Sequence, residues 1–339
     1  MTETELIRFM TLFLRERAGA VEVSIDGVRR MTGGAVRETW ALDARVTHPD
    51  GRRETLRLAW LGFRGAGHRQ FGPREEFALL RAAFEAFVPV PRPFWQGETP
   101  TGQPFYVTER VEGETIGRKI VRDDRFRYAR AALPAQLGAA LASVHRIPLG
   151  DELAFLPVPP LDRLPARWEL ERLEDLYRTL TPDPHPAFEL ALRWLVRNAP
   201  ADPGRRTLVH GDFRIGNVIV GEEGLRAVLD WELAHVGDPM EDLGWLCVRS
   251  WRFGADHLSV GGVGTREDLF EAYGQASGLA VDPARVRFWE VYGNLRWGVF
   301  TIAQARFFLD GGGGNVEHAA IGRRTAETEW EILELIGEG

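Results

Sequence analysis

A short polar loop between apolar runs constrains the fold of this 339-residue chain more than any other feature of its sequence. The loop covers residues 210–217 and reads His-Gly-Asp-Phe-Arg-Ile-Gly-Asn, directly after the β-prone run Thr207–Val209. Residues 218–220 and 225–229 are again apolar and enclose a glycine-containing turn, which predicts two strands joined as a hairpin. The polar loop is therefore expected where one strand ends and a hairpin begins.

The hairpin brings two oxygen-bearing side chains together. Because a hairpin returns the chain to its starting point, Asn217 and Asp230 are expected to lie side by side. Amide and carboxylate oxygens suit Mg²⁺, a hard cation that takes few protein oxygens and keeps water and phosphate oxygens as its other ligands. Asp212, in the same loop, is then free to accept a hydroxyl proton and direct that oxygen at phosphorus. The spacing favours phosphoryl transfer.

The same order of residues resembles a known catalytic motif. Protein kinases have His-Arg-Asp, four residues, Asn and a later metal-binding Asp, a spacing matched here by His210, Asp212, Asn217 and Asp230. Gly211 replaces the Arg, and Asp-Trp-Glu replaces Asp-Phe-Gly, which makes the chain similar to the aminoglycoside phosphotransferase family. Within that family it most resembles the kinase-like group attached to some acyl-CoA dehydrogenases.

The resemblance implies a role for each polar residue of the loop. Asp212 is the catalytic base, and Asn217 and Asp230 hold Mg²⁺. Arg214 takes the place of the loop lysine that faces the transferring phosphate. The structural alternative is a polar turn that Asp212 merely caps.

A metallohydrolase cluster is a second interpretation of the acids and histidines in this region. No histidine pair has helical zinc-ligand spacing, and the single cysteine, Cys247, excludes a thiolate cage. Asp238 is expected to cap a helix that starts at Pro239, which leaves Asp242 in its first turn, so both are interpreted as structural supports. His235 is predicted to be a loop or packing histidine. The six candidate ligands of this interpretation are His210, Asp212, Asp230, His235, Asp238 and Asp242.

Composition limits the partners and the compartment. A net charge of −7 argues against general nucleic-acid binding. One cysteine fits a reducing compartment, the first residues lack the basic segment of a signal peptide, and no apolar run approaches membrane-spanning length. We therefore expect a soluble, cytoplasmic protein that binds neither membrane nor nucleic acid. The oligomeric state is left open.

Lysine is almost absent, which bears on nucleotide binding. Lys119 is the only lysine among 42 basic residues, whereas a kinase-like N-terminal lobe carries a strand lysine paired with a helix glutamate. The predicted strand at residues 53–60 offers Arg57 instead, a forked cation suited to phosphate oxygens. Glu76 is the expected partner, and Glu75 stays open as an alternative. The alternative is that neither residue binds nucleotide, and that they are an exposed arginine and a solvated glutamate.

Two further segments are candidates for nucleotide contact. Gly33 and Gly34 lie between predicted strands at residues 21–28 and 39–46, where backbone N–H groups could meet phosphates or simply form a turn. Residues 105–113 resemble the family's strand leading into the hinge, which implies that backbone groups of Glu109 and Val111 meet adenine.

The acceptor side is less well specified. The aromatic stripe at residues 288–308 is typical of packing, but in relatives this region helps to form the acceptor pocket. That resemblance implies substrate contacts for Trp297, Gln304 and Arg323. The basic run at residues 118–130 either attracts an anionic substrate or forms a solvated helix face, and its interspersed acids favour the helix face.

These features predict a bilobal, protein-kinase-like α+β fold. Residues 1–111 would form a nucleotide-binding lobe with an antiparallel sheet, and residues 112–339 a mainly helical catalytic and substrate-binding lobe. The expected activity is ATP- and Mg²⁺-dependent transfer of the γ-phosphate to a hydroxyl of a small molecule, by resemblance a hydroxyacyl-CoA-like metabolite. A nucleotide-binding pseudokinase, an aminoglycoside, choline or sugar kinase, and a metal-dependent hydrolase remain alternatives.

Overall fold

The chain divides into two compact units, Met1–Glu112 and Gly113–Gly339. The computed structural model describes residues 1–31, 37–63, 70–202, 204–311 and 316–337, so Gly33 and Gly34 lie outside the described residues. The division falls within one residue of the expected boundary at 111/112. The roles predicted for the two units are not tested by this division.

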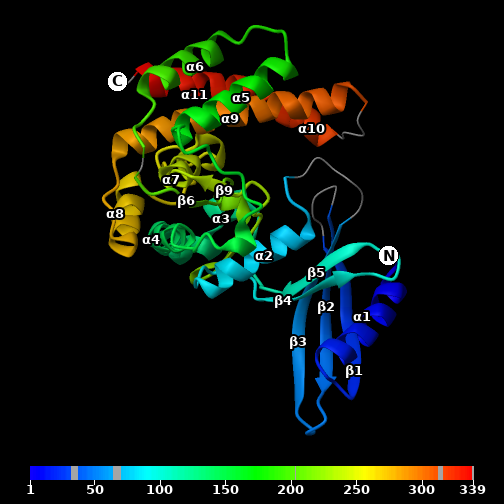
Figure 1. Ribbon diagram of the computed structural model, residues 1–339. Helices are drawn as coiled ribbons and strands as arrows, with labels where there is room; N and C mark the ends of the chain where they lie inside the picture. The colour runs from blue at the N-terminus through cyan, green and yellow to red at the C-terminus, as the bar shows by residue number, and fades with distance from the viewer. Residues whose placement is uncertain (32–36, 64–69, 203, 312–315, 338–339) are drawn as a thin grey trace. The chain divides into compact units, whose positions relative to one another are not determined.

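The first unit is built on a five-stranded antiparallel sheet with the strand order β1-β2-β3-β5-β4 (Figure 1). The strands predicted at residues 21–28, 39–46, 53–60 and 105–113 are present as β1, β2, β3 and β5, with ends shifted by a few residues. Strand β4 was not predicted. Its elements are α1 (Glu3–Arg17), β1 (Glu22–Met31), β2 (Arg37–Thr47), β3 (Arg53–Phe63), α2 (Pro73–Glu85), β4 (Pro93–Glu98) and β5 (Pro104–Glu109).

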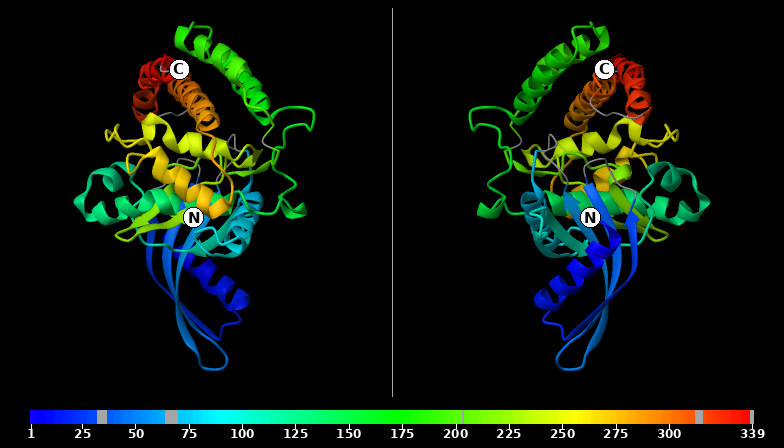
Figure 2. Two further views of the ribbon diagram at one scale, coloured as in Figure 1. Left: turned by 90° about the vertical axis from the view of Figure 1, so that its left-hand side faces the viewer. Right: turned by 90° about the vertical axis from the view of Figure 1, so that its right-hand side faces the viewer.

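Helix α1 packs along this sheet, as the views in Figure 2 show. It begins with a capping box in which the Thr2 side chain accepts from the Glu5 N–H and the Glu5 carboxylate accepts from the Thr2 N–H. Leu6, Met10 and Leu14 then recur on one helical face and are completely buried with the inward side chains of the strands. The core of the first unit lies between α1 and the sheet.

The second unit is mainly helical. Helix α4 packs on α8, and α9 packs on α7, α10 and α11. The helices are α3 (Gly117–Arg122), α4 (Arg127–Val144), α5 (Pro165–Leu180), α6 (Pro186–Asn198), α7 (Met240–Cys247), α8 (Arg266–Ser277), α9 (Pro283–Leu309), α10 (Val316–Gly322) and α11 (Thr325–Gly337), with short 3₁₀ turns η1 (Asp124–Phe126), η2 (Asp151–Leu153), η3 (Ile215–Asn217) and η4 (Arg249–Trp251).

Four short strands carry the polar loop. β6 (Thr207–Val209) pairs with β9 (His235–Gly237), and β7 (Val218–Gly221) pairs with β8 (Gly224–Val228) as the predicted hairpin. His235 therefore lies in a strand and not in a loop, because a three-residue strand leaves no periodicity to detect, and its burial agrees with the alternative prediction of a packing histidine. The first residues of the unit join the same hairpin, since Glu114 and Val220 exchange backbone hydrogen bonds of 2.9 and 3.0 Å.

Helix α7 starts close to the predicted position. Its first residue is Met240, one residue later than the expected Pro239. Asp238 nevertheless caps the helix as predicted, because its Oδ1 accepts a 3.0 Å hydrogen bond from the Met240 N–H.

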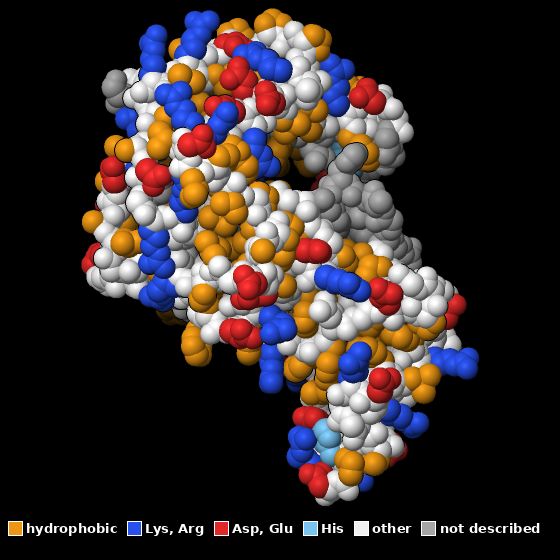
Figure 3. Space-filling model, viewed as in Figure 1, with side chains coloured by type: hydrophobic (Ala, Val, Ile, Leu, Met, Phe, Trp, Pro, Cys, Tyr) orange, Lys and Arg blue, Asp and Glu red, His pale blue; other side chains and the backbone are white. Residues whose placement is uncertain are grey.

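Charged side chains of both signs are interspersed on the face drawn in Figure 3. The basic run follows this pattern, since Lys119 and Arg125 both form ion pairs with Glu114, at 3.3 and 3.7 Å. The structure thus favours the solvated helix face for this segment. None of the described helices is both long and apolar enough to cross a lipid bilayer.

Candidate active site

Three hydrogen-bond donors hold the carboxylate of Asp212. Its Oδ1 accepts from Trp245 Nε1 at 2.8 Å and from Arg214 Nε at 3.1 Å, and its Oδ2 accepts from Asn217 Nδ2 at 2.5 Å. The Asp212 side chain retains 14% exposure, so the carboxylate is fixed but still reachable by a bound molecule. A fixed and accessible carboxylate has the properties required of a general base.

Asn217 and Asp230 are neighbours through the hairpin, as the spacing predicted. The Leu229 N–H donates to the Asn217 carbonyl oxygen at 2.8 Å, and Asp230 is the next residue, with a left-handed backbone at φ +66°. Asn217 Nδ2 also donates to the Asp212 carbonyl oxygen at 3.0 Å, so the amide nitrogen is committed to Asp212 and the amide oxygen faces elsewhere. The backbones of Asn217 and Asp230 are thus brought together, and their side chains carry an amide and a carboxylate oxygen, donors of the kind that suits Mg²⁺.

His210 is a neutral structural histidine. It is completely buried, and its Nδ1 accepts from the Asp212 N–H at 3.2 Å while its Nε2 donates to the Leu229 carbonyl at 3.1 Å. Burial lowers the pKa of His210, which agrees with an uncharged ring whose two nitrogens play different parts. His210 thus ties the loop of Asp212 to the strand end that leads into Asp230.

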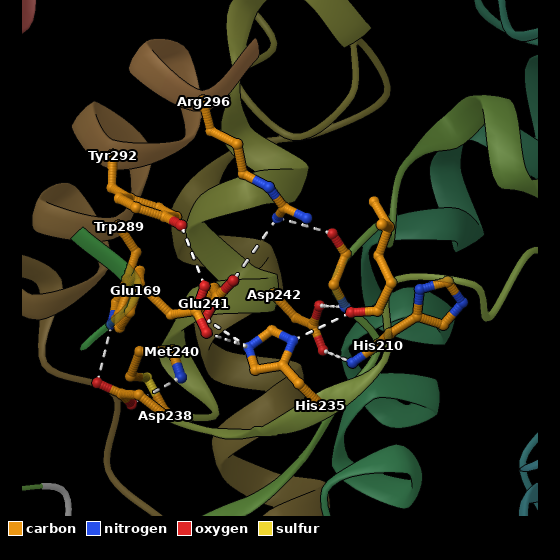
Figure 4. Close-up of polar contacts among 12 residues, drawn as sticks. Glu169, His210, His235, Asp238, Met240, Glu241, Asp242, Trp289, Tyr292 and Arg296 are labelled. Atoms are coloured by element: carbon orange, nitrogen blue, oxygen red, sulfur yellow. Dashed lines mark hydrogen bonds and ion pairs between the residues drawn. The ribbon is translucent and has the colours of Figure 1, made fainter. Parts of the chain in front are cut away.

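Asp242 holds the main chain of the same loop (Figure 4). Its Oδ2 accepts from the His210 N–H at 2.8 Å and its Oδ1 from the Gly211 N–H at 2.9 Å. His145 Nε2 adds a third hydrogen bond of 3.1 Å to Oδ2. Burial raises the pKa of Asp242, but hydrogen bonding to and attraction by His145 outweigh it, so the pKa lies below its usual range. The carboxylate is therefore charged and supports the loop from behind, as expected for a structural residue.

Gly211 is required by a close approach. Its φ is +79°, and a Cβ at this position would lie 2.3 Å from the Leu233 carbonyl oxygen. This contact explains why the position that holds arginine in protein kinases is glycine here. The Gly211 carbonyl oxygen in turn accepts a 2.9 Å hydrogen bond from Arg296 Nη1 of α9.

A cluster of aromatic rings and arginines lies beside Asp212. Trp245 contacts Trp251 at 5.3 Å between ring centroids, and Trp251 contacts Trp297 at 4.9 Å. Arginine guanidinium groups stack on two of these rings: Arg214 lies 4.8 Å from the ring of Trp251, and Arg296 lies 4.8 Å from the ring of Trp245. Arg214 is thereby held between an aromatic face and the Asp212 carboxylate.

A second buried group of charges lies behind the loop (Figure 4). His235 Nε2 donates to Glu241 at 3.1 Å and lies 3.9 Å from a carboxylate oxygen of Glu169, and its Nδ1 donates to the Leu233 carbonyl. Burial opposes the charged form of His235, but the carboxylates of Glu241 and Glu169 raise its pKa to about 9. Arg296 lies 3.6 Å from Glu241 and links this group to Gly211.

The metallohydrolase interpretation finds no support here. Among the residues that the structure describes, no three His, Cys, Asp or Glu side chains gather where they could hold a metal ion. Asp238 Oδ2 instead accepts from Arg285 at 2.6 Å and from Trp289 Nε1 at 2.8 Å. Its neighbours in the sequence, His235 and Asp242, have the separate partners described above.

The nucleotide-side candidates lie in the first unit. Arg57 is exposed on β3, and Glu76 is buried on α2, where the Tyr106 hydroxyl donates to it at 3.2 Å. The Glu109 N–H donates to the Arg92 carbonyl at 2.8 Å, and the Glu109 carbonyl oxygen accepts a 3.1 Å hydrogen bond from the Thr108 hydroxyl. Val111 is half-buried next to the unit boundary. Nucleotide contacts by these residues stay predictions.

The acceptor-side candidates are spread along the C-terminal helices. Trp297 is half-buried in the aromatic cluster and is connected to Arg214 through Trp251. Gln304 is half-buried further along α9, and Arg323 is exposed between α10 and α11. The structure thus connects Trp297 with the loop of Asp212, while Gln304 and Arg323 stay predictions.

Sequence reasoning missed two residues that contact the loop and a third, His145, that supports it through Asp242. Trp245 donates to the Asp212 carboxylate, Arg296 donates to the Gly211 carbonyl, and His145 donates to Asp242. Trp245 follows Asp242 by three positions on one helix, so one face of α7 was the available signal.

A model of the family described as "Phosphotransferase enzyme family" matches residues 45–289. The chain belongs to the phosphotransferase enzyme family. Acyl-CoA dehydrogenase family member 11 of Rattus norvegicus is 32% identical over 178 residues, which cover 50% of this chain. The match spans only about a fifth of the rat protein, 22% of its length. Both parts of the resemblance stated from the loop motif are therefore confirmed.

Solved structures confirm the predicted α+β fold of this phosphotransferase family member. A putative aminoglycoside phosphotransferase from Ralstonia eutropha has a TM-score of 0.74 at 21% identity, with 96% of this chain and 98% of that chain covered. The GDP complex of aminoglycoside 2'-phosphotransferase-IIIa has a TM-score of 0.60 at 14% identity and covers 96% and 99% of the two chains. At these identities the likeness concerns the fold alone.

Proposed function

We propose that this chain transfers the γ-phosphate of ATP to a hydroxyl group of a small molecule. The observation that carries the proposal is the Asp212 carboxylate, fixed by three donors and adjoined by Asn217 at 2.5 Å. A nucleotide substrate is supported by the GDP found with the structurally similar aminoglycoside 2'-phosphotransferase-IIIa. We assign the nucleotide to residues 1–111, with Arg57, Glu76, Glu109 and Val111, and catalysis to residues 112–339.

The chemistry follows from the carboxylate and the loop arginine. Asp212 accepts the proton of the acceptor hydroxyl, and that oxygen forms a bond to the γ-phosphorus as the bond from phosphorus to the β–γ bridging oxygen breaks and ADP leaves. Arg214, held against Trp251, provides positive charge beside the carboxylate. Asn217 and Asp230 would hold Mg²⁺, which supplies neutralisation of phosphate charge when bound.

For the acceptor we propose a hydroxylated acyl compound, by analogy with the acyl-CoA dehydrogenase relatives. The surroundings of Asp212 support an uncharged or anionic acceptor, because they combine tryptophan rings with the guanidinium groups of Arg214 and Arg296. A polycation such as an aminoglycoside would meet like charges there. Trp297 lies in this cluster and is the proposed acceptor contact with the most support from the structure.

The test is phosphoryl transfer by the wild type and by Asp212→Asn. The protein is incubated with ATP, Mg²⁺ and a panel of hydroxyacyl-CoAs, hydroxy acids, sugars, choline and aminoglycosides, and ADP release and phosphorylated product are measured. Asp212→Asn is expected to lower kcat by about 10²- to 10⁴-fold, the usual contribution of a general base. The exposed Asp175→Asn serves as the matched control and should retain full activity.

Nucleotide binding without transfer would overturn the proposal. A wild type that gains thermal stability from ATP and Mg²⁺ but phosphorylates no member of the panel is a nucleotide-binding pseudokinase. Turnover of an acceptor without any nucleotide would indicate a hydrolase instead. Equal rates for the wild type and Asp212→Asn would remove Asp212 from the reaction.

A further inference from the structure

We propose that Trp245 is a positioning residue that selects which oxygen of Asp212 receives the proton. This inference rests on the proposed function. Trp245 touches neither nucleotide nor acceptor in this scheme and acts only through its 2.8 Å hydrogen bond to Asp212 Oδ1.

The distribution of donors over the carboxylate supports this role. Oδ1 accepts from both Trp245 and Arg214, and these two bonds occupy its two lone pairs. Oδ2 accepts only from Asn217 among the described residues, so one lone pair remains on that oxygen. The acceptor proton therefore goes to Oδ2. Without the Trp245 bond, the carboxylate could turn and offer either oxygen.

The helix that carries Trp245 makes it a rigid support. Asp242, on the same helix α7, holds the backbone of the loop at His210 and Gly211, and Trp245 holds the side chain of Asp212. Trp245 is only 2% exposed, and its ring lies beneath the guanidinium group of Arg296. One helix, α7, thus holds both the backbone of the loop and the carboxylate of Asp212.

A glycine on α9 lies next to the Trp245 ring. A Cβ on Gly293 of α9 would lie 2.8 Å from the Val248 side chain and 3.2 Å from the Trp245 ring, so glycine leaves room for both side chains. A simple core role would need only the ring and not its N–H.

Other tryptophans show that packing does not require the N–H to be bonded. Trp231, Trp251 and Trp297 are close to the same loop or cluster, and their Nε1 atoms have no hydrogen-bond partner among the described residues. Trp245 differs from them in donating to the proposed base. That difference separates a positioning role from an aromatic packing role.

The experiment compares Trp245→Phe with Trp231→Phe. Both variants keep an aromatic ring and lose an indole N–H beside the loop, but Trp231 donates to no described group and packs on His210 at 4.5 Å. Steady-state kinetics are measured over pH with the acceptor identified for the wild type. Trp245→Phe is expected to lower kcat about tenfold, near the lower end of the worth of a hydrogen bond to a charged group, with the KM for ATP changed less than twofold.

The pH profile provides the second readout. A donated hydrogen bond favours the charged form of a carboxylate, so its loss should move the acidic limb of the kcat profile of Trp245→Phe to higher pH. Trp231→Phe should keep the wild-type limb. In an Asp212→Asn background, Trp245→Phe should change kcat by less than twofold, because the two residues act through one contact.

If Trp245→Phe does not fold, Trp245 is replaced by benzothienylalanine instead. In this analogue, sulfur takes the place of the indole N–H. An active wild type whose Trp245 variants match Trp231→Phe in kcat and pH profile overturns the role of Trp245 alone. Equal losses in both phenylalanine variants, without a shift of the acidic limb, also overturn it. A wild type without any phosphoryl transfer overturns the proposed function as well.

Discussion

Asp242→Asn should destabilise the second unit and at the same time misplace the loop that carries Asp212, the proposed base. The carboxylate accepts three hydrogen bonds, from His210 N–H, Gly211 N–H and His145 Nε2. Asparagine offers one oxygen and replaces the other by an NH₂ group. If the amide oxygen takes the place of Oδ2, it keeps the bonds from His210 and His145, and the Gly211 N–H then faces a second donor.

The loss of folding free energy in Asp242→Asn can be estimated from these hydrogen bonds. A buried N–H left without an acceptor costs about 1–3 kcal/mol, and loss of the charge weakens the two remaining bonds by about 1 kcal/mol. The expected sum is about 3 kcal/mol, which lowers the melting temperature of a unit of this size by roughly 6–12 °C. Because Gly211 precedes Asp212, we also expect a lower kcat with little change in the KM for ATP.

The assay is thermal unfolding by circular dichroism, followed by kinetics on the folded variant below its transition. Asp175→Asn on the exposed side of α5 is the control, expected within about 0.5 kcal/mol of the wild type. If Asp242→Asn melts within 2 °C of this control, about the effect of 1 kcal/mol or less, the reasoning about the carboxylate is refuted.

Two further predictions concern the same unit. The fold favours charged His235, because its pKa of about 9 exceeds the value of about 6.5 for an unfolded histidine. Its contribution of about 3 kcal/mol to folding stability is therefore complete below pH ~6.5 and is lost as the pH rises through 9. Urea unfolding across this pH range should show the loss in the wild type, and an equally steep loss in His235→Gln would contradict the prediction. Gly211→Ala should cost about 2–4 kcal/mol of folding stability through the clash with Leu233 and the positive φ. Gly278→Ala, at φ +75° with no atom of a described residue within 4 Å of the added Cβ, should cost about 1 kcal/mol in the same denaturation assay.

The local part of the site was predictable from the sequence. Asn217 and Asp230 are joined by a hairpin of adjacent strands, so the spacing of apolar and turn residues was enough to bring them together. Strands β1, β2 and β3 of the first unit were also predictable, because 10 or 11 residues leave several alternations each, whereas the six-residue β4 was missed.

The remote supports of the site were not predictable. Arg296 lies 85 positions from Gly211, and His145 lies 97 positions from Asp242. Their contacts depend on how α4, α7 and α9 pack, and a buried arginine or histidine within an apolar stripe has the same sequence pattern as a core position. The donor on Trp245 was missed because aromatic periodicity reports burial and not the direction of an indole N–H.

The two main-chain hydrogen bonds between Glu114 and Val220 determine at which residue a fragment containing only the second unit should begin. A fragment that starts at Gly113 keeps both bonds and with them the second partner, beside β8, of the strand that follows Asn217. A fragment that starts only two residues later exposes the edge of β7, and an unpaired strand edge invites association with another chain. Isolation of the second unit therefore depends on Glu114, a residue that has no part in the proposed chemistry.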